Sequence, residues 1–298
     1  MDPQPAAPQP STPQPAAPQP AAPQPATPQP ATPQPAGRAS LDRAPLDRAP
    51  LDRAPVEQAR RLVRERFPDA LAAVLAGSTA RGRATPGSDL DIAVLVPEGA
   101  GTFRETLRFE GRPVELFVHT RAGLAELFAA DVATRRAVLQ DMYLDGLVLT
   151  DPAGEAARAR ALAGADLRQG PPPLPPEAVE TKRYGLTDAL DDLADAGDPF
   201  ERLAVGAVVL AGAADLLLDH HRAWTGGGKW LPRRLLAADP GRGRALLEGH
   251  RRLCVSGEHA ALAAAASEVL GLVGGPLREG YRRTWRGVIE SVAVQAGH

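Results

Sequence analysis

Apolar and polar positions first take up a regular pattern near Val56. Val56, Ala59 and Val63 recur at helical spacing, while arginines occupy the other faces. This pattern predicts an amphipathic helix that ends before Pro68, because the residue before a proline disfavours helical backbone. We expect the folded part of the chain to begin with this helix.

Four short apolar runs follow, and together they predict a small sheet. These runs are 71–76, 89–96, 103–109 and 114–119. The last two flank Glu110-Gly111-Arg112-Pro113, which is typical of a β-hairpin turn. Helical sequence from residue 122 to about 142 and a short apolar segment at 147–149 complete this region. The pattern is that of a mixed sheet covered by helices.

Proline marks the end of this region. Residues 171–176 read Pro-Pro-Pro-Leu-Pro-Pro, a stiff connector that neither a helix nor a central strand can include. Beyond it we predict five helical segments, with Gly or Pro at most junctions. These segments are 177–196, 199–224, 230–238, 243–272 and 276–295. The predicted fold class is therefore α+β, with a mixed-sheet domain at 56–165 and an α-helical bundle domain at 171–298.

The first 55 residues are of low complexity. Residues 3–36 repeat Pro-Gln-Pro-x-x, and residues 41–55 continue the same period as three copies of Leu-Asp-Arg-Ala-Pro. Proline supplies no amide donor, and these repeats offer almost no apolar surface, so we predict a disordered tail rich in polyproline II. We interpret it as a dispensable extension in preference to a spacer or a ligand for a proline-binding partner.

Composition narrows the classes of partner. The net charge of −2 gives no overall attraction to nucleic acid or to an anionic membrane surface, so neither partner is expected. Cys254 is the single cysteine, which excludes an intrachain disulfide and a thiolate zinc cluster. No uninterrupted apolar stretch approaches the ~20 residues of a membrane span, and no signal-peptide pattern is found. We therefore expect a cytoplasmic protein.

Two aspartates lie two residues apart at the start of the second apolar run. Asp89 and Asp91 alternate with Leu90 and Ile92, so on a strand the carboxylates project from one face and the apolar side chains pack on the other. Carboxylates held close together repel each other unless cations lie between them, and oxygen ligands without cysteine suit Mg²⁺ or Mn²⁺. The spacing predicts a divalent metal site at Asp89 and Asp91.

A Gly-Ser pair closes the preceding apolar run. Gly77 lets the backbone approach a phosphate closely, and Ser78 lies at the start of an expected helix, where N–H groups favour anions. Arg81 is either a phosphate ligand or a solvent-facing turn residue. A Gly-Ser turn and an Asp-x-Asp pair are each common alone. Here the Gly-Ser pair ends one predicted strand, and the Asp-x-Asp pair begins the next predicted strand. The combination predicts a site for a metal-bound triphosphate.

The segment Gly77-Ser78, together with the segment Ser88 to Asp91, resembles the signature of the DNA polymerase β-like nucleotidyltransferase superfamily, in its small bacterial branch. The similarity extends over roughly residues 56–150 and implies that superfamily's α+β nucleotidyltransferase core. It also implies that Ser88 joins Gly77 and Ser78 in binding the nucleotide. A helical domain after the core is similar to the arrangement in aminoglycoside and lincosamide nucleotidyltransferases.

The resemblance further implies a third carboxylate on a neighbouring strand, and the run from Val114 to Val118 provides Glu115. In relatives this position either ligates the metal or takes the proton from the attacking hydroxyl. Both roles stay open for Glu115. So does a third interpretation, an outward-facing glutamate on a strand.

The predicted helical domain has two further features. Lys229 follows three glycines and resembles a Gly-Lys segment of aminoglycoside adenylyltransferases that touches the triphosphate, although a simple loop and helix cap is an alternative. Four aspartates share one face of the first helix of this domain, beside Tyr184. These aspartates are Asp188, Asp191, Asp192 and Asp195. The face is either a site for a cationic acceptor, with Tyr184, Asp188 and Asp192 as ligands, or a solvated surface.

We therefore expect an enzyme that transfers a nucleoside monophosphate, with Mg²⁺ or Mn²⁺, from a nucleoside triphosphate to a hydroxyl of a small acceptor. ATP as donor and an antibiotic-like, cationic acceptor are implied by the resemblance and by the acidic face. The alternatives are nucleotidylation of a protein acceptor and a non-catalytic nucleotide-binding module. The carboxylates Asp89, Asp91 and Glu115 argue against the last.

Overall fold

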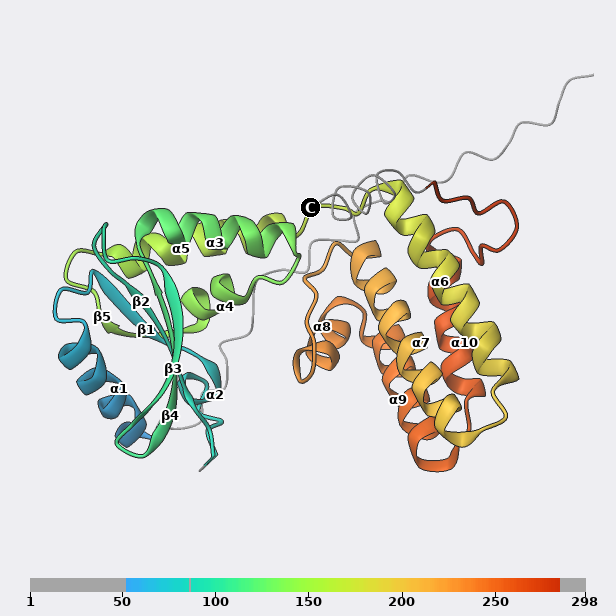
Figure 1. Cartoon of the computed structure of the whole chain (residues 1–298), viewed down its shortest axis with the longest axis horizontal. Helices are drawn as coiled ribbons and strands as arrows, with labels where there is room; N and C mark the ends of the chain where they lie inside the picture. The colour runs from blue at the N-terminus through green and yellow to red at the C-terminus, as the bar shows by residue number, and fades with distance from the viewer. Residues whose placement is uncertain (1–51, 86, 285–298) are drawn as a thin grey trace, which may run out of the picture. The chain divides into compact units, whose positions relative to one another are not determined.

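The structure is a computed structural model that describes residues 52–85 and 87–284. Almost all of the predicted tail, 1–55, and the end of the last predicted helix lie outside the described residues. The described residues form a mixed sheet with flanking helices, followed by a helical region (Figure 1). This confirms the predicted α+β fold class.

The sheet has five strands in the order β3-β4-β2-β1-β5. The strands are β1 (Ala72–Leu75), β2 (Leu90–Leu95), β3 (Phe103–Phe109), β4 (Arg112–His119) and β5 (Leu147–Thr150). β3 and β4 form the predicted antiparallel hairpin, whereas β2 and β4 run parallel and place Asp91 opposite Glu115. The parallel pair therefore brings together residues that are distant in the sequence.

Helices cover both faces of the sheet. α1 (Arg53–Arg66) packs against one face, where its buried Leu62 joins Ile92 and Leu116 in one apolar cluster. α3 (Arg121–Ala133), α4 (Val138–Asp145) and α5 (Glu155–Gln169) cover the other face, to which Ala93 and Leu95 belong. Figure 1 shows α1 on the side of the sheet opposite to α3 and α5. Because side chains alternate along β2, Asp91 points to the same face as Ala93 and Leu95.

The single helix predicted from 122 to about 142 is wrong, because the structure has α3 and α4 there. Arg135 and Ala137, which lie between them, adopt positive φ angles of 61° and 54°. The main-chain carbonyl of Arg135 accepts hydrogen bonds from the amide and hydroxyl of Thr225, at 2.7 and 2.9 Å. This carbonyl therefore binds a distant residue and not an amide of its own helix. The local sequence does not predict such a contact.

The helical region contains α6 (Pro176–Asp195), α7 (Pro199–His220), α8 (Trp230–Ala238), α9 (Pro240–Ser256) and α10 (Ala260–Leu272). The helix predicted over 243–272 is in fact α9 and α10, which separate at Gly257 with a φ of 72°. Residues 276–284 of the last predicted helix are not helical, and the rest of it lies outside the described residues.

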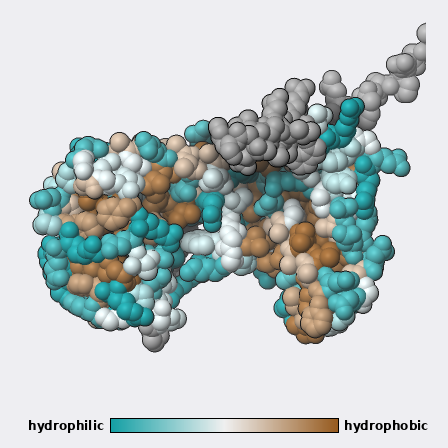
Figure 2. Space-filling view, viewed as in Figure 1, coloured by the Kyte–Doolittle hydropathy of each residue, from teal (hydrophilic) through white to brown (hydrophobic). Residues whose placement is uncertain are grey.

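The core of this region is built from leucine, valine and alanine, as the scarcity of aromatic residues requires. α7 is long and apolar enough by composition to cross a membrane. One face of this helix, with Val209, Ala213, Leu216 and Leu217, is fully buried among the other helices. Figure 2 shows hydrophilic residues over much of the visible surface, with hydrophobic residues in patches between them.

Candidate active site

Three carboxylates meet at the start of β2. They belong to Asp89, Asp91 and Glu115, which are all half-buried. Each residue contributes one carboxylate oxygen to a group whose members lie within 4.8 Å of one another. Asp91 and Glu115 are register partners on parallel strands, and Asp89 shares the face of Asp91 because it lies two residues earlier. We call Asp89, Asp91 and Glu115 the carboxylate triad.

The triad has the electrostatics of a cation site. Burial, followed by the negative charges of Asp89 and Glu115, raises the pKa of Asp91 to about 6, against the opposing effects of Lys229 and Arg81. Ionising all three groups therefore costs free energy that a divalent cation would offset. The donors are all carboxylate oxygens, which Mg²⁺ and Mn²⁺ prefer. These residues fit such an ion.

Gly77 is fitted closely against the triad. It follows β1, begins the short helix α2 (Gly77–Ala80) and has a φ of 70°. A Cβ atom built on Gly77 would lie 1.9 Å from Oδ2 of Asp91, so no other residue fits without displacing that carboxylate. α2 has only four residues, so the dipole of this helix would add little to the binding of an anion.

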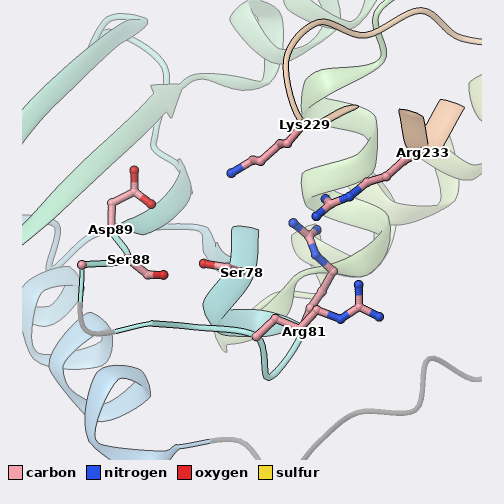
Figure 3. A pocket seen from close by; sticks show the side chains of 8 residues that line it. Ser78, Arg81, Ser88, Asp89, Lys229 and Arg233 are labelled. Atoms are coloured by element: carbon pink, nitrogen blue, oxygen red, sulfur yellow. The ribbon is translucent and has the colours of Figure 1, made fainter. Parts of the chain in front are cut away.

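A cavity of about 370 Å³ opens beside Asp89. It is lined by Ser78, Arg81, Arg83, Gly87, Ser88, Asp89, Lys229 and Arg233. Four of these eight residues are cationic and one is anionic, which suits a polyphosphate. Figure 3 shows the Lys229 amino group directed toward the space between Asp89 and Ser78, with Arg81 and Arg233 close to each other. We call this space the cationic cavity.

Contacts join helix α8 to the sheet region, one from Arg81 to Trp230 and one from Arg234 to Asp141, while Arg233 and Arg234 also stack on Trp230 within α8. The guanidinium groups of Arg81, Arg233 and Arg234 lie 5.4, 5.1 and 5.4 Å from the ring centre of Trp230. Arg234 also forms an ion pair with Asp141 of α4, and both side chains are largely buried. These contacts fix the start of α8, and with it Lys229 and Arg233, beside Asp89.

The structure brings together most of the residues that the sequence singled out. Gly77 and the three carboxylates form one cluster, and the cationic cavity adjoins it. The predicted nucleotide ligands that line the cavity are Ser78, Arg81, Ser88 and Lys229. Arg233 was missed in the sequence, although a signal existed: it follows Lys229 by four residues at the start of a predicted helix, and so lies one turn away.

The predicted acceptor residues on α6 do not line the cationic cavity. Tyr184 stacks on Tyr281, with ring centres 4.2 Å apart. Asp188 and Asp191 form ion pairs with Arg278, and Asp192 is exposed. The chain thus supplies its own cation to the acidic face, which weakens the observation on which the expectation of a cationic acceptor depended.

The described residues thus place three converging carboxylates on a mixed sheet, after a Gly-Ser turn and beside the cationic cavity. Residues 56–125, which carry the triad, match the family model described as "Nucleotidyltransferase domain". Among solved structures, the chain is similar to a nucleotidyltransferase-like protein from Exiguobacterium sibiricum, with 11% identity, a TM-score of 0.40 and coverage of 73% of this chain and 74% of that one. The comparison with curated proteins gives no match.

Proposed function

We propose that this protein transfers a nucleoside monophosphate from a nucleoside triphosphate to a hydroxyl group of a small acceptor. The observation that carries the proposal is the adjacency of the carboxylate triad and the cationic cavity, which share Asp89. Such a pair of sites suits a triphosphate whose α-phosphate lies at the triad and whose outer phosphates lie in the cavity. ATP is the proposed donor on the resemblance to the superfamily alone.

The transfer joins the acceptor oxygen to the α-phosphorus and breaks the bond between that phosphorus and the oxygen bridging to the β-phosphate. Pyrophosphate leaves with the electron pair, and the acceptor proton passes to Glu115 or to water. Ser78, Arg81, Lys229 and Arg233 hold the departing phosphates. A divalent ion held by the triad would lower the pKa of the acceptor hydroxyl and offset charge on the leaving group.

The test is transfer of label from α-³²P-ATP to acceptors in a bacterial small-molecule extract, together with pyrophosphate release, in Mg²⁺ or Mn²⁺ and in EDTA. We expect metal-dependent release that the Asp89→Asn, Asp91→Asn double variant lowers by roughly a thousandfold or more. Circular dichroism establishes that the variant is folded, and Asp69→Asn in an exposed turn is the control. Release by the double variant at the wild-type rate would show that the triad is not the site.

The two roles of Glu115 can be separated in the same assay. If Glu115 takes the proton, Glu115→Gln lowers kcat, alters the pH profile and leaves the affinity for Mn²⁺ nearly unchanged. If it ligates the metal, the same substitution weakens Mn²⁺ binding and excess metal restores part of the rate.

A further inference from the structure

The carboxylate triad separates two sides of the site. In the strand order β3-β4-β2-β1, Glu115 lies on β4, Asp91 lies on β2, and Ser78 follows β1. The cationic cavity, with Ser78 and Lys229, is therefore on the β1 side of the triad. The hairpin strand β3 is on the other side.

The chemistry assigns a substrate to each side. In phosphoryl and nucleotidyl transfer, the attacking and leaving oxygens lie roughly in line through the phosphorus. If the departing pyrophosphate occupies the cationic cavity, the acceptor hydroxyl must approach from the opposite direction, across Glu115 and β3. This step rests on the proposed function.

The side chains on this acceptor side are basic. Arg104, Thr106 and Arg108 alternate along β3 and share the face of Glu115, because Thr106 is the register partner of Glu115. Glu105 lies on the opposite face, where it pairs with Arg66 of α1. Within the described part of β3, the site face thus carries two arginines and no acid.

Arg104 is the arginine held in place. Its Nη2 donates to Oε2 of Glu115 at 2.7 Å, and its guanidinium lies over the Phe117 ring, 4.8 Å from the centre. The side chain nevertheless keeps 61% of its surface exposed. Among the described residues, it is the one whose cation lies within ion-pair distance of the triad. Two fixed contacts and free N–H groups prepare it to bind an anion in a defined orientation.

We propose that Arg104 selects the acceptor, and that the acceptor is a small hydroxyl compound carrying a phosphate or carboxylate group near the reacting hydroxyl. The guanidinium would bind that group while Glu115 lies beside the hydroxyl. A cationic acceptor would meet Arg104 with like charge, whereas an anionic acceptor offsets its own repulsion from the triad through this contact.

The experiment supplies α-³²P-ATP and Mg²⁺ to the full chain, with a bacterial small-molecule extract separated by ion exchange into anionic, neutral and cationic fractions. We expect the labelled product to form from the anionic fraction. Prior phosphatase treatment of that fraction separates a phosphate-bearing acceptor from a carboxylate-bearing one. The proposal would be overturned if label passed from ATP only to compounds of the neutral or cationic fraction, only to protein, or only to water.

Variants test the residue itself. Arg104→Gln should raise KM for the anionic fraction by about tenfold to a hundredfold, the usual effect of losing a charged hydrogen bond, with KM for ATP unchanged. Arg104→Lys should restore part of this loss. Arg108→Gln is the matched control, because Arg108 shares the strand face but its guanidinium donates to the Gly111 carbonyl. Equal effects of Arg104→Gln on all fractions would contradict a role in selection, whereas the absence of any metal-dependent pyrophosphate release would instead contradict the proposed function.

Discussion

Gly77 and Asp91 act as one unit at the scale of single residues. The Cβ of an alanine at position 77 would lie 1.9 Å from Oδ2 of Asp91, at a φ of 70°. We expect Gly77→Ala to lower the rate of transfer by roughly a hundredfold or more, because it displaces a triad carboxylate. Gly99→Ala controls for backbone strain, since Gly99 has a φ of 92° with open space around its Cβ position. Equal loss of activity in the two variants would contradict the steric explanation.

The ionised side chain of Asp91 lowers the free energy of unfolding of the protein. Its pKa is raised to about 6 in the folded protein, so ionisation in the folded state is penalised above that pH. The penalty is fully present above pH 6 and disappears as pH falls toward the unfolded-state pKa of about 3.9. Without metal, Asp91→Asn should therefore raise the free energy of unfolding at pH 8 by on the order of 1–3 kcal/mol, and hardly change it at pH 4.

Thermal melts in EDTA at both pH values measure this difference, with Asp69→Asn as the control. At pH 8, saturating Mg²⁺ should reduce or reverse the advantage of Asp91→Asn, because the wild-type triad gains more from the ion. A variant that is no more stable at pH 8 than at pH 4, relative to wild type, would contradict the raised pKa.

At this scale the sequence predicts the carboxylates of the site better than it predicts the residues that contact them. Asp89 and Asp91 could be placed on one face from the period of a strand alone, whereas the placement of Glu115 needed the resemblance. Arg104 was not predicted, because the role proposed for it depends on contacts with Glu115 and Phe117 across the hairpin. Cross-strand contacts of this kind follow from register, which the sequence pattern only suggests.

At the scale of elements, helix α8 is the part that completes the cationic cavity. Lys229 and Arg233 lie one turn apart at its start and both line the cavity. We expect Lys229→Gln or Arg233→Gln to raise KM for ATP by about tenfold each, since in the proposed function each substitution removes a charged contact with phosphate. Affinity for Mn²⁺ alone should be unchanged in direct binding measurements.

Arg244→Gln provides the matched control for α8, because Arg244 is exposed on α9 and does not line the cavity. The double variant of Lys229 and Arg233 should lose less than the product of the single effects if both contact the same phosphates. Unchanged KM values for ATP in both single variants would place the triphosphate elsewhere.

Elements with local signals were predicted, and those shaped by distant contacts were not. The hairpin and α8 follow from apolar patterning and turn residues, and the structure has them. The break between α3 and α4 depends on Thr225 binding the carbonyl of Arg135, and α5 was missed because alanine and arginine give it a weak apolar pattern. The break at Gly257 had a readable signal, since glycine is the usual residue in a left-handed helix cap.

At the scale of the whole molecule, the nucleotide should act as a stabilising ligand. The cavity is lined by residues of α2, of the loop between α2 and β2, and of the start of α8, so a bound triphosphate would add contacts among these three segments. With Mg²⁺-ATP at 100 times its Kd, we expect a gain of about 2.7 kcal/mol. This corresponds to a rise in Tm of about 5–10 °C for a chain of this size.

Differential scanning fluorimetry measures this shift, with Mg²⁺ alone and ATP in EDTA as reference conditions. The double variant Lys229→Gln, Arg233→Gln should keep the response to Mg²⁺ and lose most of the response to ATP. An equal response to ATP in wild type and variant would contradict a cavity completed by α8.

Side chains alternate between the two faces of β2 and β4. The carboxylate triad therefore forms only while Asp91 and Glu115 stay an even number of residues from the neighbours that share their face at present. Inserting one residue between the start of β4 and Glu115 would turn the carboxylate to the face that α1 covers, whereas a longer loop between β2 and β3 would leave Asp91 and Glu115 opposite each other. The loop at residues 97–102 therefore tolerates change in length, whereas β3 tolerates change only in its outward-facing side chains. If Arg104 selects the acceptor as proposed, substitutions on the outward face of β3 should alter which acceptors are used and leave the geometry of the carboxylate triad unchanged.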